Sequence, residues 1–102
     1  TSYVEKIKDG VSKMVSEDVM ITIISSKDLG TGGVEVVIEA FGEIQASSQQ
    51  EANQKIATAI KKQCQGMGIS LKGMKDLIPN NLGEAVGETY KVKIRASIVI
   101  PK

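Results

Sequence analysis

The sequence predicts an α+β fold in which two helices pack on one face of a four-stranded, mainly antiparallel sheet, within a single domain spanning residues 1–102. Two segments carry this prediction, because residues 34–46 and 90–100 both place apolar side chains at nearly every even position. The odd positions of the first segment include Glu35, Glu39 and Glu43, and those of the second include Lys91, Lys93 and Arg95. A period of two is typical of a strand with one buried face and one solvent face.

The two alternating segments are of similar length, and their solvent faces carry opposite charge. We therefore predict that they are antiparallel neighbours joined by cross-strand charge pairs. Exposed pairs of this kind each contribute less than about 1 kcal/mol, so they set the register more than the stability.

A first helix is predicted from about Tyr3 to Ser16. Ser2 and Glu5 form a capping box, in which a serine side chain caps the helix and a glutamate follows three residues later. Val4, Ile7 and Val11 then recur at the spacing of one helical face.

The segment from Val19 to Ile24 is apolar at both parities, which predicts a buried or central strand. Residues 25–33 read as a flexible connection to the strand at 34–46. Gly42 interrupts the inner face of that strand and suggests a bulge, a bend or a tight reversal.

A second capping box, Ser48 and Glu51, opens the clearest helix of the chain. The inner stripe of this helix is Ala52, Ile56, Ala59 or Ile60, and Cys64 or Met67. Gly66 is the predicted residue just past its end.

Ile69 and Leu71 alternate with polar residues and predict a short strand, and residues 73–88 read as a long loop with a possible helical turn at 74–78. A helical crossover makes the strand at 34–46 parallel to this short strand. The last strand fits between them and runs antiparallel to both. The predicted sheet order is therefore 1-2-4-3, with both helices on one face.

The composition argues against an enzyme. His is absent, which removes the commonest general base and the commonest metal ligand. The one cysteine, Cys64, lies on an inner helical stripe and is expected to be a buried, inert thiol. No catalytic constellation appears at useful spacing, so we expect no catalytic residues, no bound metal and no cofactor.

Two further motifs favour structural interpretations. Gly30, Gly32 and Gly33 precede a strand, whereas a phosphate-binding loop leads into a helix N-terminus, so a hairpin loop is expected. The three glutamates of residues 34–46 are spaced at about twice the roughly 7 Å between same-face neighbours, which is too far for one metal ion.

No apolar run approaches the roughly 20 residues of a membrane helix, so no membrane partner is expected. We expect a cytoplasmic protein. An exported domain whose signal peptide has been removed is the alternative, because a lone cysteine fits either compartment.

Charge is divided unevenly along the chain. Residues 1–54 have four lysines against nine acids, a net −5, and residues 55–102 have nine basic residues against three acids, a net +6. Mutual neutralisation within one domain is the preferred interpretation. Nucleic acid is the alternative partner, through the basic set Lys72, Lys75, Lys91, Lys93 and Arg95. Phe41 is the one aromatic residue on that face, whereas single-strand binders use several.

Two family resemblances bear on function. The order helix, two strands, helix resembles a double-stranded-RNA-binding domain, although Gln49, Gln50, Glu51 and Asn53 stand where such domains are basic. Residues 34–102 resemble dodecins, small flavin-storing assemblies, in a strand, a Ser-capped helix with Glu51-Ala52 and a closing strand of the form Tyr-Lys-Val-Lys-Ile. Dodecins stack their flavin on a Trp, which this chain lacks, so the resemblance implies topology and oligomerisation.

The preferred functional prediction is a non-catalytic binding or assembly module that self-associates through an open sheet face or an edge strand. A nucleic-acid-binding domain and a dodecin-like, ligand-binding oligomer are the alternatives. The predicted interaction face consists of Glu35, Val37, Glu39, Phe41, Glu43, Lys91, Lys93, Arg95 and Val99.

Overall fold

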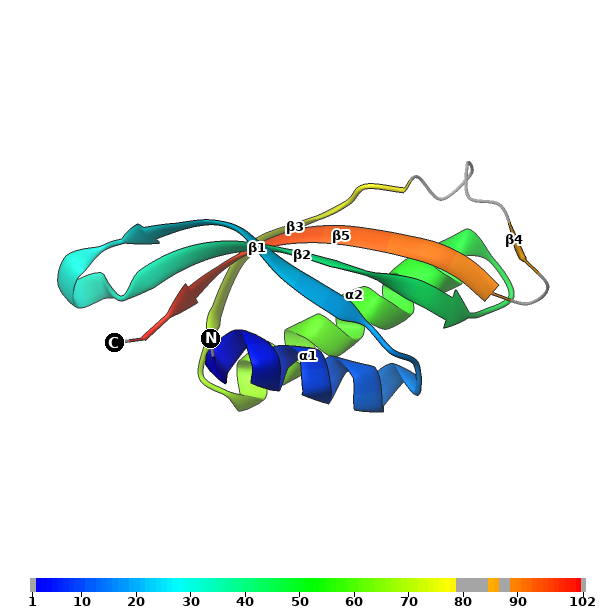
Figure 1. The fold of residues 1–102 in the computed structure, drawn as a ribbon, viewed down its shortest axis with the longest axis horizontal. Coiled ribbons are helices and arrows are strands. Elements are labelled where there is room, and N and C mark those ends of the chain that lie inside the picture. The colour runs from blue at the N-terminus through cyan, green and yellow to red at the C-terminus, as the bar shows by residue number, and fades with distance from the viewer. Residues whose placement is uncertain (1, 79–84, 87–88, 102) are drawn as a thin grey trace.

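A computed structural model describes residues 2–78, 85–86 and 89–101 (Figure 1). Its helices and strands are α1 (Ser2–Val15), β1 (Met20–Asp28), β2 (Val34–Gln45), α2 (Gln49–Gly66), β3 (Ser70–Asp76), β4 (Ala85–Val86) and β5 (Thr89–Ile100). Both helices lie on the same side of the sheet. The long strands are ordered β1-β2-β5-β3 with antiparallel neighbours, and the two-residue β4 pairs with the start of β5. The predicted α+β fold and strand order are confirmed.

The central pair of strands, β2 and β5, is in register along its whole length. Twelve residue pairs run from Val34 opposite Ile100 to Gln45 opposite Thr89 without a shift. Gly42 lies opposite Val92 within this regular ladder, so the predicted bulge or tight reversal there is wrong. A Cβ on Gly42 would lie 3.2 Å from the carbonyl oxygen of Asp18. The glycine therefore lets the chain that enters β1 pass close to β2.

The even positions of β2 and β5 face the helices, as the alternation predicts. Apolar side chains of both strands and both helices form one buried cluster. The residues expected at its centre are all buried: Ile38, Ile56, Ile60, Val92, Ile94 and Ile98. Cys64 is buried in the same cluster, and the loss of solvent raises the pKa of its thiol.

Each helix is followed, within two residues of its end, by a left-handed residue that turns the chain toward a strand. After α1 this residue is Ser16, with a φ of 57°, and the N–H of Glu17 donates to the carbonyl of Ser12. After α2 it is Gly68, with a φ of 70°, and the N–H of Ile69 donates to the carbonyl of Cys64. Both closures follow the Schellman pattern. The predicted terminating glycine, Gly66, is instead the last residue of the helix.

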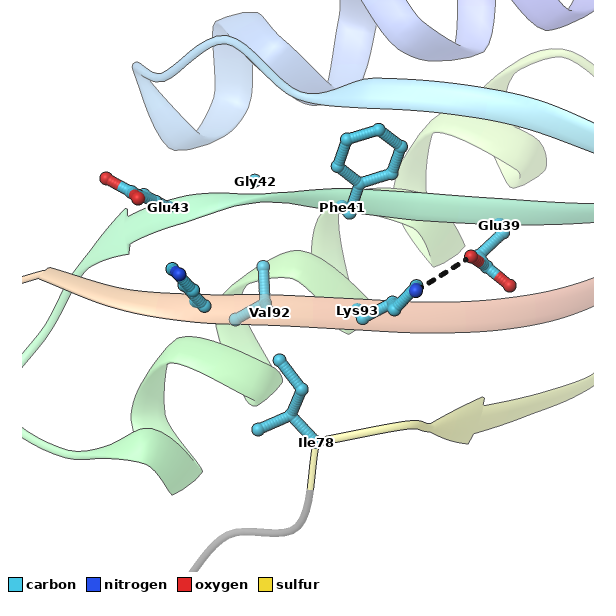
Figure 2. Close-up of a pocket in the computed structure, with 8 residues that line it drawn as sticks. Glu39, Phe41, Gly42, Glu43, Ile78, Val92 and Lys93 are labelled. Carbon is cyan, nitrogen blue, oxygen red and sulfur yellow. Dashed lines mark ion pairs between the residues drawn. The ribbon is translucent and has the colours of Figure 1, made fainter. Parts of the chain in front are cut away.

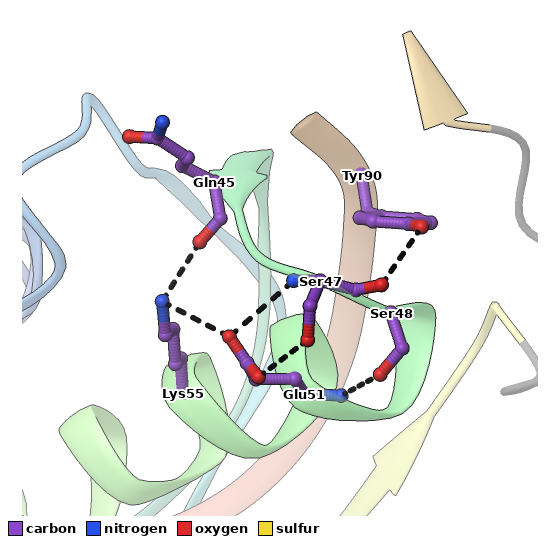
Figure 3. A network of polar contacts seen from close by, with 6 residues as sticks. All are labelled: Gln45, Ser47, Ser48, Glu51, Lys55 and Tyr90. Atoms are coloured by element: carbon purple, nitrogen blue, oxygen red, sulfur yellow. Dashed lines mark hydrogen bonds and ion pairs between the residues drawn. The ribbon is translucent and has the colours of Figure 1, made fainter. Parts of the chain in front are cut away.

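The turn from β2 into α2 is fixed by a polar network (Figure 3). The Ser48 hydroxyl accepts a hydrogen bond from the N–H of Glu51, as predicted for the helix cap. The Glu51 carboxylate accepts from both the N–H and the hydroxyl of Ser47, which lower its pKa. Lys55 bridges this carboxylate to the carbonyl of Gln45, and the Tyr90 hydroxyl donates to the carbonyl of Ser47.

Two buried amides of α2 reach the sheet where β3 no longer accompanies β5. Gln49 donates to the carbonyl of Lys91 at 2.7 Å and to the side chain of Asn53 at 3.0 Å. Asn53 in turn donates to the carbonyl of Ile78 at 3.1 Å. These side chains satisfy carbonyl groups that a longer strand would otherwise pair.

The edge strand β1 differs from its prediction in burial and in length. Ile21 is buried, but Ile23 and Ile24 are each 47% exposed, so β1 is neither buried nor central. It also continues to Asp28, through residues predicted to be a loop. A bulge at Ile24 interrupts the pairing with β2. β1 and β2 extend beyond the helices (Figure 1), so polar residues occupy both faces of the sheet there. The alternation of apolar and polar residues that would predict a strand is therefore missing from this part of the sequence.

The edge strand β3 is longer than predicted, since residues 73–76 belong to it rather than to a loop or a helical turn. A bulge at Lys72 shifts the register, so that Leu71 and Met74 both lie opposite inward-facing residues of β5. Their spacing of three resembles helical periodicity, which explains the error. The remainder of the predicted loop includes β4 and residues outside the described ranges.

Candidate functional site

The candidate site is the face of the sheet opposite the helices, called here the open face. Its residues are Met20, Thr22, Ile24, Ser25 and Lys27 on β1, Glu35, Val37, Glu39, Phe41 and Glu43 on β2, Lys91, Lys93, Arg95, Ser97 and Val99 on β5, and Ser70, Lys72, Gly73 and Lys75 on β3. Figure 1 shows no described helix or strand covering it. All nine residues of the predicted interaction face lie on this one surface.

The centre of the open face is an ionic cluster around Glu39. Its carboxylate accepts a hydrogen bond from Arg95 at 3.0 Å and forms a 3.4 Å ion pair with Lys93. The Arg95 hydrogen bond is the main cause that lowers the pKa of Glu39, with Lys93 adding to it. The Glu39 side chain is only 13% exposed because the two cations, each about half exposed, cover it.

The other two glutamates have different neighbours. Glu35 lies opposite Val99, and Glu43 lies opposite Lys91. Among the described residues, the ion pairs of the open face are those made by Glu39. The predicted antiparallel pairing of the two charged faces is therefore confirmed, whereas close ion pairing is concentrated at one glutamate.

One row of residues crosses the open face from edge to edge. Thr22 is paired with Glu39, Glu39 with Arg95, and Arg95 with Lys75. Acidic residues follow β2, while basic residues follow β5 and β3. The open face is therefore divided lengthwise into an acidic stripe and a basic stripe.

The apolar residues of the open face form two groups. Phe41 is paired with Met20 across β1 and β2, and these side chains are 39% and 49% exposed. Val37 and Val99 lie toward the opposite end, where the bulge also places Ile24. Glu39 separates Phe41 from Val37, a distance of about 14 Å along the strand. Phe41 and the two valines of the predicted interaction face therefore do not form one apolar patch.

A shallow hollow of about 330 Å³ lies beside Phe41 (Figure 2). Gly42 and Val92 form its floor, Ile78 borders it from the segment after β3, and charged residues of both strands surround it. Ile78 reaches this position because the N–H of Leu77 donates to the carbonyl of Lys93 at 2.7 Å, which extends the chain along β5. Sequence reasoning missed Ile78 because this part of the chain was taken for a loop.

The chemistry-bearing residues elsewhere occupy structural positions. Gly30–Gly32 form a short 3-10 turn that leads into β2, as expected for a hairpin connection. Gly33 has a φ of 100°, and a Cβ there would lie 2.5 Å from the carbonyl oxygen of Ile100. Among the described residues, no three Asp, Glu, Cys or His side chains are grouped closely enough to hold a metal ion.

Comparisons with protein-family models, curated proteins and solved structures found no match to this chain. Within the described ranges, neither helix combines the length and apolarity needed to cross a bilayer.

Proposed function

We propose that this protein is a non-catalytic assembly module that binds a second copy of itself through the open face. The observation that carries the proposal is the Phe41–Met20 pair, two large apolar side chains exposed side by side on a sheet face that no described helix or strand covers. Sheets with one apolar layer of helices normally leave a polar second face in contact with water. Exposed apolar residues mixed with both signs of charge favour contact with a like surface.

The mixed charge argues for a protein partner rather than a polyanion. Glu39 engages Lys93 and Arg95, the two cations nearest the centre of the basic stripe. A nucleic acid approaching this face would also meet Glu35 and Glu43 on the adjoining strand. Sequence-independent nucleic-acid binding depends on uncompensated basic side chains that release counterions.

Light scattering on a size-exclusion column tests the proposal. Wild-type protein should elute as an oligomer, and Phe41→Lys should shift it toward the monomer, because a charge replaces an apolar contact. Met14→Lys is the matched control. Met14 is 46% exposed on α1, away from the open face, so the same change there should leave the oligomer intact.

A wild-type monomer at about 1 mM protein would refute self-association. The Kd would then be above about 1 mM, which corresponds to a binding free energy of only about 4 kcal/mol. Tight, salt-sensitive binding to RNA or DNA that Lys93→Glu abolishes would instead support the nucleic-acid alternative.

A further inference from the structure

We infer that the second copy docks on the open face about a two-fold axis that runs along the strands, between β2 and β5. In this arrangement β2 of one copy lies over β5 of its partner, and the two sheets pack face to face. The inference rests on the proposed self-association and adds the orientation of the partner.

The lengthwise division of charge selects this axis. β2 presents Glu35, Glu39 and Glu43, and β5 presents Lys91, Lys93 and Arg95. A two-fold axis along the strands exchanges the two strands, so each acidic stripe faces a basic stripe. An axis across the strands would place β2 over β2 and β5 over β5. Like charges that face each other in an interface repel and disfavour that arrangement.

The same axis fixes which rows meet. A two-fold rotation about the strand direction does not move a residue along that direction. Each row of residues therefore faces the same row of the partner, with the order of the four strands reversed. In the central row, Glu39 faces the partner's Arg95. Thr22 on one edge strand faces the partner's Lys75 on the other. The basic residue at the β3 edge therefore meets an uncharged one.

Apolar side chains lie beside the axis. Phe41 and Val37 are on β2, next to the axis, so Phe41 lies over the partner's Lys93 and Val37 over the partner's Ser97. Each is displaced from its own copy by one strand spacing of about 5 Å. Met20 supports Phe41 from β1. The ionic cluster of Glu39 then lies between the row of Phe41 and the row of Val37, whose apolar side chains reduce the access of solvent and salt to its charges.

The size of the open face suits such a dimer. Its four long strands contain 7 to 12 residues each. At about 3.4 Å per residue and 4.8 Å between strands, the flat area is on the order of 650 Å². Standard stable interfaces bury about 800 Å² of accessible surface per partner, and side-chain relief raises the accessible area above the flat value. Face-to-face sheets pack with strands within about 30° of each other, which keeps the rows close.

Thiol cross-linking between variants that each add one cysteine to the central row tests the orientation. Thr22→Cys and Lys75→Cys place thiols on the outer strands, and Cys64 is buried, so unmodified protein serves as the background control. Facing sheets lie about 10 Å apart, so a bifunctional reagent of that span should join Thr22→Cys to Lys75→Cys in a mixture. Two copies of Thr22→Cys would place their thiols roughly 17 Å apart and should not be joined.

The outcomes separate the orientation from the self-association on which it rests. Cross-linking in the mixture at least ten times faster than in either variant alone supports the axis along the strands. Faster cross-linking of Thr22→Cys with itself overturns that axis in favour of β1 facing β1. An oligomer that gives no cross-link in any combination overturns the face-to-face arrangement, and a wild-type monomer overturns self-association as well.

Discussion

Replacing Ile94 by alanine tests the assignment of the inner face and the core. Ile94 is fully buried on β5, opposite Ala40 of β2. The substitution removes three carbons, worth about 2.4 kcal/mol at roughly 0.8 kcal/mol each. Ala40 is too small to fill the space, and a cavity on the order of 80 Å³ at about 24 cal/mol per Å³ adds up to about 1.9 kcal/mol. The free energy of unfolding should therefore fall by about 2.5–4 kcal/mol.

Ile23→Ala is the matched control, because it makes the same chemical change on the same face of the sheet. Ile23 is 47% exposed on the edge strand β1. It should cost only about 1 kcal/mol, since about half of the transfer energy is lost and the space opens to water.

Urea denaturation followed by circular dichroism measures both variants. Each must be compared with wild type at one protein concentration, because association of folded copies adds to apparent stability. Equal losses for the two variants, or a loss below about 1 kcal/mol for Ile94→Ala, would show that the assigned inner face of β5 is wrong.

Three further predictions concern single positions. Gly33→Ala should destabilise the protein by more than about 2 kcal/mol in urea melts, because its φ is 100° and a Cβ would contact the backbone of Ile100; wild-type stability would contradict this. Ser16→Gly should stabilise it by about 0.5–1 kcal/mol, because glycine accepts the φ of 57° without strain, and a lower melting temperature would count against the helix-end assignment. The pKa of Glu39 is lowered in the folded state, so its contribution to stability is present above about pH 4.5 and is lost as the pH falls through the folded-state pKa. Glu39→Gln should therefore lose less stability than wild type between pH 5 and about pH 2.5. Parallel pH profiles of the two proteins would refute the role of Arg95.

Most of the fold follows from the sequence because its central strands are regular. The alternation of β2 and β5 has one phase from end to end, so register, neighbour and inner face all follow from it. Both helices follow from their apolar spacing, and α2 also from its Ser48 cap. Topology then places the third strand, since a helical crossover returns to the same sheet.

The errors occur where a bulge resets the period or where no helix covers the strand. The bulge at Lys72 gives Leu71 and Met74 a helical spacing, and polar residues up to Asp28 look like a loop. The same bulges limited the prediction of the site. The nine charged and apolar residues of β2 and β5 were found from parity alone, whereas Met20 and Ile24 on β1 were taken for core residues. A run that is apolar at both parities does not reveal which of its residues face outward.

The hydrogen bonds of Gln49 and Asn53 tie the first turns of α2 to the last part of the sheet. Their donors reach the carbonyls of Lys91 and Ile78, so the helix cannot fray at this end without exposing backbone groups of the sheet. Local opening of the two elements is therefore cooperative. The amide proton of Leu77, which bonds to Lys93, should exchange with solvent at the rate at which the start of α2 unwinds, and not at the faster rate of an ordinary frayed strand end.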